Sequence, residues 1–337
     1  MSASGTPAVT PDRILQIAWG YAPPIIVATA AKLNLFDALE HGPQTAAAVA
    51  RRTKTSERGI RPLLNALVGL QLLAKSGKDQ YALTPESAAF LVSGKPGYLG
   101  TVLQHLGRDL VPQWLELPDT VQSGRPVRDV SQEAGAEFFE SLVVGLFPLN
   151  FPAAQALGKA LNLGAAKPIK ILDIAAGSGV WGIGIAQHAA GSTVTAVDWP
   201  NVLEVTKRFA AEHGMADRFS YVAGDMQTVN FGHGYDVAVL GHILHSEGEK
   251  KSRELLKKVA QSLAPGGIIA IPEYLVNEER TGPPMGLFFA INMLVNTDEG
   301  DTFSYEEISQ WLQEAGFTNP RKIEPGGPAA VVVAQKA

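Results

Sequence analysis

A glycine-rich segment in the second half of the chain has the residue types that bind an adenosine-containing cofactor. It begins at Asp173 with the sequence DIAAGSGVWG and follows an apolar run that predicts a buried strand. Glycines let a ligand approach the backbone closely, and the helix expected after them offers free N–H groups. Asp198 lies 21 residues beyond Gly177, at the end of the next expected strand, where a carboxylate can accept hydrogen bonds from both ribose hydroxyls.

Three further features favour S-adenosylmethionine over a nicotinamide dinucleotide. Asp173 lies inside the first strand, where a carboxylate suits the ammonium of an amino-acid moiety better than a pyrophosphate. Asp225 and Met226 follow the third strand, where they can accept from the adenine amino group and pack on its ring. Residues 320–334 predict a terminal antiparallel hairpin, which is atypical of NAD-binding folds. The expected cofactor-binding residues are Asp173, Ala175, Gly177, Gly179, Asp198, Trp199, Gly224, Asp225, Met226 and His242.

Two histidines follow the fourth expected strand, at the edge where open α/β sheets bind ligands. His245 is a candidate general base, because the ordinary pKa of histidine suits removal of a proton from a phenol or alcohol. Glu273, at the end of the fifth strand, can orient its imidazole. We expect His242 to line the cofactor or substrate pocket. No metal is expected, since the histidine pair lacks the third ligand of the usual zinc signatures.

Alternating strands and helices must position these side chains. The segment after Pro168 predicts a mostly parallel, doubly wound sheet. The expected strands cover residues 169–175, 193–198, 219–223, 235–240 and 267–274, and the expected helices cover residues 180–189, 202–213 and 249–263.

The first half of the chain predicts a winged helix-turn-helix. Helices are expected over 23–40 and 45–52, a third carries its apolar face from Ile60 to Val68, and a hairpin ends at a helix start, Thr84 to Glu86. Residues 41–75 carry a net charge of +5, which suits DNA, but such a domain also serves in dimerisation.

Length and composition limit the number of domains and the classes of protein to which the chain can belong. The chain has 337 residues, enough for about two domains, with 46% hydrophobic and 18% charged residues. Its net charge of −5 argues against a nucleic-acid partner. With no cysteine, disulfides and thiolate metal sites are excluded. The longest apolar runs, 23–31 and 287–295, are shorter than the roughly 20 residues that span a bilayer, and no secretory signal is evident, so we expect no membrane association and a cytoplasmic protein.

Over nearly its whole length the chain resembles the O-methyltransferase family that includes plant caffeic-acid-type enzymes, acetylserotonin methyltransferase and bacterial polyketide tailoring enzymes. The matching motifs are residues 173–179, 197–199 and 224–226; the family's His-Asp dipeptide falls on His245-Ser246, and its fifth-strand acidic residue falls on Glu273. The resemblance implies a class I methyltransferase domain with a seven-stranded Rossmann-like sheet, S-adenosylmethionine as cofactor, and an N-terminal, mainly helical winged-helix domain that joins two subunits into a homodimer. The expected divisions are 11–95 for dimerisation, 96–165 as a helical linker contributing to the substrate pocket, and 166–337 for the cofactor.

An acceptor pocket is expected between the helical linker and a Met/Phe-rich helix over 283–296, which contributes to that pocket in the family. Asn292 and Asn296 lie on one face of the helix, where buried amides need partners. Large aromatic side chains of the linker can line a site for a flat apolar ligand. The expected pocket residues are Trp114, Phe147, Phe289, Asn292, Met293 and Asn296.

Three positions depart from the family pattern. Ser246 replaces the usual aspartate, Gly241 stands where a basic residue is common, and Thr302 stands where a second acidic residue is common, with Asp301 beside it. The favoured function is methyl transfer to a hydroxyl of a small, aromatic acceptor. Transfer to sulfur or carbon, catalysis by proximity without a strong base, and a cofactor-sensing DNA-binding protein stay open.

Overall fold

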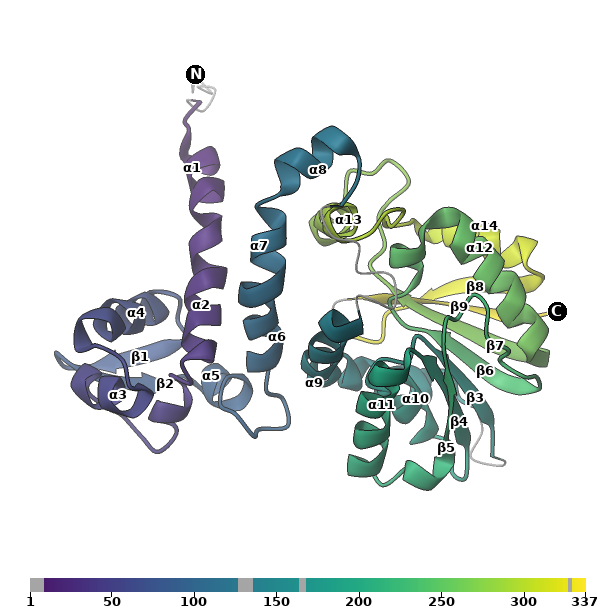
Figure 1. Ribbon diagram of the computed structural model, residues 1–337, viewed down its shortest axis with the longest axis horizontal. Helices are drawn as coiled ribbons and strands as arrows, with labels where there is room; N and C mark the ends of the chain where they lie inside the picture. Colours follow the sequence, from purple (N-terminus) through teal and green to yellow (C-terminus); the bar gives the residue numbers. More distant parts are fainter. Residues whose placement is uncertain (1–8, 127–135, 164–167, 327–328) are drawn as a thin grey trace, which may run out of the picture. The chain divides into compact units, whose positions relative to one another are not determined.

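The computed structural model describes residues 9–126, 136–163, 168–326 and 329–337 (Figure 1). The chain divides into two compact units between Arg108 and Asp109. This division falls inside the segment 96–165 that the sequence predicts as a helical linker.

The first unit has helices followed by a short hairpin, in the order that the sequence predicts. Its elements are α1 (Asp12–Ala18), η1 (Trp19–Tyr21), α2 (Ala22–Lys32), η2 (Asp37–Leu39), α3 (Ala46–Thr53), α4 (Glu57–Gly69), β1 (Leu73–Ser76), β2 (Gln80–Leu83), α5 (Pro85–Phe90) and α6 (Gly100–His105). The side chain of Thr45 accepts from the N–H of Ala48 at the start of α3, and Thr84 and Ser87 form a capping box at α5. Ile60, Leu64 and Leu67 of α4 are buried in the core of this unit.

Helix α2 is shorter than expected. It ends at Lys32, whereas the sequence predicts a helix up to Glu40. Asn34 adopts a left-handed conformation with φ 50°, and the N–H of Leu35 donates back to the carbonyl of Ala30. Asparagine tolerates this conformation, so the chain turns there and buries Leu35 in the core.

The apolar N-terminal stretch is longer than expected, because η1 joins α1 to α2. By length and composition alone, the helical run Asp12–Lys32 could cross a membrane, a property shared with core helices of soluble proteins and with signal sequences. Several of its apolar side chains are exposed, among them Ile14, Ile17 and Trp19.

The second unit has a seven-stranded sheet in the order β5-β4-β3-β6-β7-β9-β8 (Figure 1). Its strands are β3 (Lys170–Ile174), β4 (Thr193–Asp198), β5 (Phe219–Ala223), β6 (Tyr235–Leu240), β7 (Leu263–Glu273), β8 (Phe317–Ile323) and β9 (Ala330–Lys336). Strands β3 to β7 run parallel, and the terminal hairpin of β8 and β9 adds antiparallel strands beside β7. The predicted class I sheet with its terminal hairpin is confirmed.

The second unit also has helices before and between the strands of this sheet. They are α7 (Val111–Trp114), α8 (Leu117–Ser123), α9 (Ala136–Ala160), α10 (Val180–Ala186), α11 (Pro200–Glu212), η5 (Ala216–Arg218), α12 (Leu244–Ser262), α13 (Pro284–Asn296) and α14 (Tyr305–Glu314); a π-helical turn, Leu106–Leu110, precedes α7. Successive residues of β3 face opposite cores: Ile171 packs in the cluster that includes α9 and α10, and Leu172 packs with α12 and α14.

The sheet's topology determines where a ligand binds. The chain runs from β3 outward through β4 to β5, then returns to β6 on the other side of β3. The carboxyl ends of β3 and β6 therefore flank a topological switch point, which is the ligand-binding position of open α/β sheets. The carboxyl ends of β3, β4, β5, β6 and β7 and the loops after them carry the expected cofactor-binding residues and the expected catalytic pair, His245 and Glu273.

Candidate active site

The loop after β3 is held in a conformation suited to glycine. Ala175, Gly177 and Gly179 have φ values of 52°, 57° and 72°. The hydroxyl of Thr206 donates to the carbonyl of Gly177 at 2.7 Å, which ties the loop to α11. A Cβ on Gly179 would lie 2.9 Å from the Cγ2 of Thr206, so both the conformation and the space require glycine there.

Asp198 ties this loop to the end of β4. Its Oδ2 accepts from the N–H of Gly177 at 2.8 Å, and its Oδ1 accepts from the N–H of Trp199 at 2.7 Å. The N–H of Gly224 donates to the Asp198 carbonyl at 3.0 Å, which brings the end of β5 alongside. Burial raises the pKa of Asp198 to about 6, although the two backbone donors act in the opposite direction. Each carboxylate oxygen retains a lone pair that can accept a ribose hydroxyl.

Asp173 has a buried carboxylate that is only half satisfied. The side chain is 1% exposed, and its Oδ2 accepts from the N–H of Gly182 at 2.9 Å. Its Oδ1 has no hydrogen-bond partner in the described part of the chain. Burial raises the pKa of Asp173 to about 8, and the charge of Asp198 adds to the effect. An unpaired oxygen on a buried carboxylate fits a cationic ligand group, as expected for the amino-acid end of the cofactor.

The segment after β5 is held by its own hydrogen bonds. The Oδ1 of Asp225 accepts from the N–H of Gln227 at 2.8 Å. Lys258 donates from Nζ to the Met226 carbonyl at 2.7 Å, and the Met226 side chain packs against the core around α12. The segment is thus fixed beside Asp198, as a site for the adenosine end requires.

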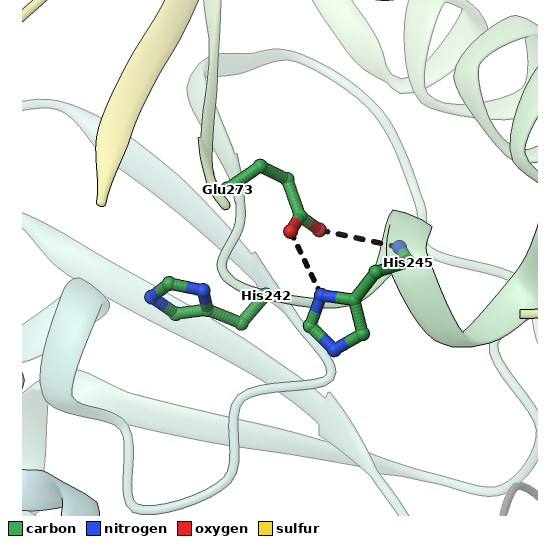
Figure 2. A group of neighbouring side chains, drawn as sticks. All are labelled: His242, His245 and Glu273. Atoms are coloured by element: carbon green, nitrogen blue, oxygen red, sulfur yellow. Dashed lines mark hydrogen bonds and ion pairs between the residues drawn. The ribbon is translucent and has the colours of Figure 1, made fainter. Parts of the chain in front are cut away.

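A histidine–glutamate dyad lies at the carboxyl ends of β6 and β7 (Figure 2). His245 comes from the first turn of α12 and Glu273 is the last residue of β7. The Nδ1 of His245 lies 2.7 Å from the Oε2 of Glu273, and the residues are 8% and 3% exposed. Burial by itself would raise the pKa of Glu273, but the charge of His245 and its hydrogen bond outweigh burial and lower it. The Nε2 of His245 has no partner among the described residues and points away from Glu273 (Figure 2).

Helix α12 begins earlier than expected, because a kink at Gly248 joins an additional turn to its start. The sequence predicts a helix from Glu249, but α12 begins at Leu244 because a first turn joins it across Gly248, which has φ 73°. A Cβ on Gly248 would lie 2.5 Å from the carbonyl oxygen of Glu299, so the kink also requires glycine.

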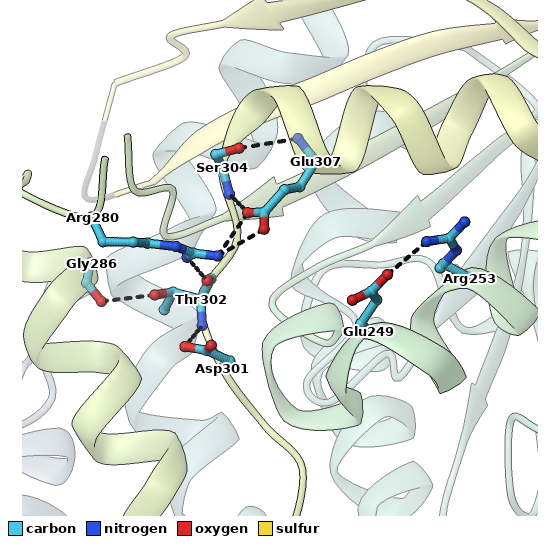
Figure 3. Close-up of polar contacts among 8 residues, drawn as sticks. All are labelled: Glu249, Arg253, Arg280, Gly286, Asp301, Thr302, Ser304 and Glu307. Carbon is cyan, nitrogen blue, oxygen red and sulfur yellow. Dashed lines mark hydrogen bonds and ion pairs between the residues drawn. The ribbon is translucent and has the colours of Figure 1, made fainter. Parts of the chain in front are cut away.

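The segment that contacts the backbone of His245 is held by a polar network around Arg280, Thr302 and Glu307 (Figure 3). The N–H of Asp301 donates to the His245 carbonyl at 2.8 Å. Arg280 donates to the Thr302 carbonyl and, through Nη2, to both carboxylate oxygens of Glu307 at 2.8 and 2.9 Å. Thr302, at a position that is often acidic in the family, is buried and donates from its hydroxyl to the Gly286 carbonyl.

No second carboxylate reaches the ring of His245 within the described ranges. The side chain of Asp301 is exposed and accepts from the N–H of Thr302 at 2.7 Å. Ser246 uses its hydroxyl to donate to the Ile243 carbonyl at 2.9 Å. Glu273 is therefore the only carboxylate that contacts the His245 ring in the described part of the chain.

His242 lies next to the dyad with its ring unpaired. It has φ 58°, and its N–H donates to the Pro272 carbonyl at 2.9 Å. The ring centroid lies 5.1 Å from that of Tyr274 and 5.9 Å from that of Trp181. Both ring nitrogens are shielded from solvent and have no partner in the described part of the chain. Burial lowers the pKa of His242 to about 4, so its imidazole is neutral at physiological pH.

The position of the Trp181 indole explains why residue 241 is a glycine. A Cβ on Gly241 would lie 2.3 Å from both Cδ1 and Nε1 of the Trp181 indole. The indole thus fills the space that the basic side chain common in the family would enter. Sequence analysis did not identify this tryptophan, or Tyr274, as part of the site; the adjacency of Tyr274 to Glu273 was the signal available for the latter.

Phe289 lies beside the dyad, and three further expected acceptor residues, Trp114, Asn292 and Asn296, are joined by hydrogen bonds. The ring centroid of Phe289 lies 4.8 Å from that of His245 and 4.4 Å from that of Tyr274. Trp114 donates from Nε1 to the Oδ1 of Asn292 at 3.0 Å. Asn296 donates to the Asn292 carbonyl at 2.8 Å and keeps a buried Oδ1 without a partner in the described ranges. Met293 of the same helix is buried.

Phe147 was expected in the pocket, but the structure packs it elsewhere. It stacks on Phe209 of α11 at a centroid distance of 4.3 Å and on Phe151 at 5.0 Å. It belongs to the core cluster around α9 and α10 and is 6% exposed. Its apolar surface is satisfied by this stack, so we assign it to the core.

Comparisons with known proteins identify the family. A profile of the O-methyltransferase domain matches residues 156–318, and one of the O-methyltransferase dimerisation domain matches residues 15–93. The chain is 30% identical to the 3-hydroxy-5-methyl-1-naphthoate 3-O-methyltransferase of Streptomyces sahachiroi, with 100% of this chain and 99% of that protein aligned.

Two further relatives agree. The S-adenosyl-L-methionine-dependent methyl transferase PigF of Serratia sp. is 27% identical over 91% of both chains. The solved structure of PigF with SAH superposes with a TM-score of 0.84, covering 97% of this chain and 100% of that chain at 25% identity. A crystal structure from Nostoc punctiforme, assigned as an O-methyltransferase, superposes with a TM-score of 0.89 at 29% identity, covering 98% of this chain and 100% of that one. The chain belongs to the O-methyltransferase family, carries its dimerisation domain, and is an S-adenosylmethionine-dependent O-methyltransferase.

Proposed function

We propose that this enzyme methylates a hydroxyl group of a small aromatic acceptor, with His245 as the general base. The observation that carries the proposal is the buried 2.7 Å contact between the Nδ1 of His245 and Glu273. Glu273 holds the ring proton at Nδ1, which leaves the lone pair of Nε2 free to take a proton from the acceptor. Glu273 also stabilises the imidazolium that forms.

An aromatic acceptor suits the surroundings of the dyad. Phe289 and Tyr274 offer ring surfaces next to His245, and aromatic rings favour offset or edge contacts at such distances. The relative from Streptomyces sahachiroi acts on a hydroxynaphthoate, which supports a flat acceptor here. Asn296 offers an unpaired amide oxygen that a polar group of the acceptor can satisfy.

We infer that the cofactor is held through its two ends. When bound, S-adenosylmethionine supplies an electrophilic methyl group on its sulfonium. The free Oδ1 of Asp173 would pair with its ammonium, and Asp198 would accept from its ribose hydroxyls. Asp225 and Met226 would contact the adenine. Holding nucleophile and methyl group in line can lower the barrier by about 7–11 kcal/mol, so positioning carries much of the rate.

Replacing His245 tests the base. With a phenol of ordinary pKa as acceptor, we expect His245→Ala to lower single-turnover methyl transfer by about 10²–10⁴-fold, with unchanged cofactor affinity. With an acidic phenol that is already ionised, the loss should be less than about tenfold, because proximity carries the rate. Identical rates and pH profiles for variant and wild type on the ordinary phenol would show that His245 is not the base.

Two matched variants test whether Glu273 acts by orienting the ring of His245 or only by supporting the fold. Glu273→Gln keeps an oxygen that can accept from Nδ1 but removes the charge, so we expect an intermediate loss. Asp301→Asn changes an exposed carboxylate that contacts only a backbone N–H, and should keep the wild-type rate. If both variants lost the same activity, Glu273 would have no special role.

We further propose that the enzyme is a homodimer joined through its first unit. Ile14, Ile17 and Trp19 are 71%, 69% and 67% exposed on the described chain, an apolar surface that water disfavours. The match to the dimerisation profile covers Ile17 and Trp19. Light scattering should give a mass near twice 35.7 kDa, and Ile17→Glu should lower it towards the monomer. A wild-type monomer at micromolar concentration would contradict the proposal.

A further inference from the structure

His242, His245 and Glu273 are neighbours at the carboxyl ends of β6 and β7 (Figure 2). Each offers one ligand atom, and the three atoms all lie within 4.8 Å of one another. Three points that close share a position no more than about 2.8 Å from each (4.8 Å divided by √3). Zinc–nitrogen and zinc–oxygen bonds are about 2.0–2.2 Å, so shifts of less than about 1 Å would bring the three ligand atoms to bonding distance, with a fourth position left for water.

The chemistry of the three groups suits zinc. Two imidazoles and one carboxylate are the ligand set of many catalytic zinc sites, which leave a fourth position for water. Both ring nitrogens of His242 are buried and have no hydrogen-bond partner among the described residues, so the neutral imidazole has a lone pair that can bind a metal ion. Glu273 offers a carboxylate that is already fixed by His245.

In the metal-free state His245 and Glu273 share a proton. Their 2.7 Å separation is a hydrogen bond, and it is shorter than the separation of about 3.3–3.6 Å between two ligands of a tetrahedral zinc ion. The ion would therefore have to move the two groups apart and displace the proton from Nδ1. Metal binding and base catalysis then exclude each other.

We propose that His242, His245 and Glu273 form an inhibitory Zn²⁺ site in the active centre. The inference rests on the proposed function of His245 as the base. When Zn²⁺ bonds to Nδ1, the neutral imidazole must carry its single proton on Nε2, and this proton transfer occurs through solvent with no net release. The lone pair that would take the acceptor's proton is then lost. The metal thus switches the tautomer of the base without occupying the acceptor pocket.

Binding can be measured without any methyl acceptor. The full-length enzyme, stripped with EDTA and free of cofactor, is titrated with ZnCl₂ by calorimetry, and in parallel with CoCl₂, whose visible absorption reports tetrahedral coordination. We expect one ion per chain. His242→Ala and Glu273→Gln should each weaken binding by at least about tenfold, since each removes one of three protein ligands. His233→Ala, which removes an exposed histidine outside the cluster, is the matched control and should bind as wild type does.

A wild-type measurement guards against variants that fail to fold. Crystals of the wild type soaked in ZnCl₂ should give an anomalous peak between the three side chains, and a peak elsewhere or none would overturn the proposal. Equal binding by wild type and His242→Ala would overturn it as well. Methyl transfer should fall over the same Zn²⁺ range that saturates the site and return with EDTA. Zinc binding at the three residues in a protein that methylates no hydroxyarene would refute the proposed function alone.

Discussion

Cofactor affinity should rise with pH because of Asp173. Burial raises the pKa of Asp173 to about 8, so most apo molecules carry a neutral carboxyl there at neutral pH. An ammonium group binds the ionised form, and the proton must leave before the pair can form. With a pKa of about 8, the ionised fraction grows from about 3% at pH 6.5 to about 24% at pH 7.5, which predicts about eightfold tighter binding at the higher pH.

This pH range isolates Asp173 from the other titrating groups. Asp198, with a pKa of about 6, is already mostly ionised at pH 6.5. An α-amino group, with an ordinary pKa of about 7.7–8.0, is still mostly charged at pH 7.5. Calorimetry in two buffers of different ionisation enthalpy should also detect release of nearly one proton per cofactor bound at pH 6.5.

Asp173→Asn is the matched control. The asparagine oxygen can still accept from the N–H of Gly182, so the turn after β3 keeps its contact, but the site can no longer ionise. Its affinity should be low and independent of pH. A wild-type affinity that changes by less than twofold between pH 6.5 and 7.5, or an equal slope in Asp173→Asn, would refute the assignment of the ammonium to Asp173.

Two further predictions concern the neighbouring positions. Asp198→Ala should weaken cofactor binding at least about tenfold in a protein that remains folded, because hydrogen bonds to a charged acceptor contribute about 1.5–3 kcal/mol each; unchanged affinity by calorimetry would remove Asp198 from the site. Gly241→Lys should lower the free energy of unfolding by about 1–3 kcal/mol, because its Cβ would lie 2.3 Å from the indole of Trp181. In a Trp181→Leu background the same substitution should cost clearly less. If denaturant unfolding showed that the two losses simply add, the steric explanation would be wrong.

The sheet was largely predictable because its signals are local. The bounds of β4, β5 and β6 agree with the expected 193–198, 219–223 and 235–240. Short apolar runs between turn residues specify such strands without reference to the rest of the chain. Strand β7 begins at Leu263, earlier than expected, because the turn expected at Pro265 and Gly266 lies inside the strand: Gly266 has φ 74°, and the register against β6 shifts there.

Helix ends were less predictable, because they depend on single backbone conformations. Asn34 ends α2 by turning left-handed, and Gly248 lets α12 continue across a kink. Neither asparagine nor glycine always adopts a positive φ, so tertiary contacts select it at these two positions. The turn at Asn34 buries Leu35, and the carbonyl of Glu299 lies close to Gly248. Apolar periodicity also cannot separate core from pocket: Phe147 stacks on Phe209 in the core, whereas Phe289 lies beside the ring of His245.

The departures from the family pattern are physically connected in this active centre. Gly241 is required by Trp181, whose indole takes the place of a basic side chain and packs beside His242. Thr302 in turn serves the backbone network behind His245, so no second carboxylate contacts that ring among the described residues. Since Glu273 is the only carboxylate that contacts the His245 ring among the described residues, we expect a change that moves the proton off Nδ1 to slow the proposed proton removal by His245.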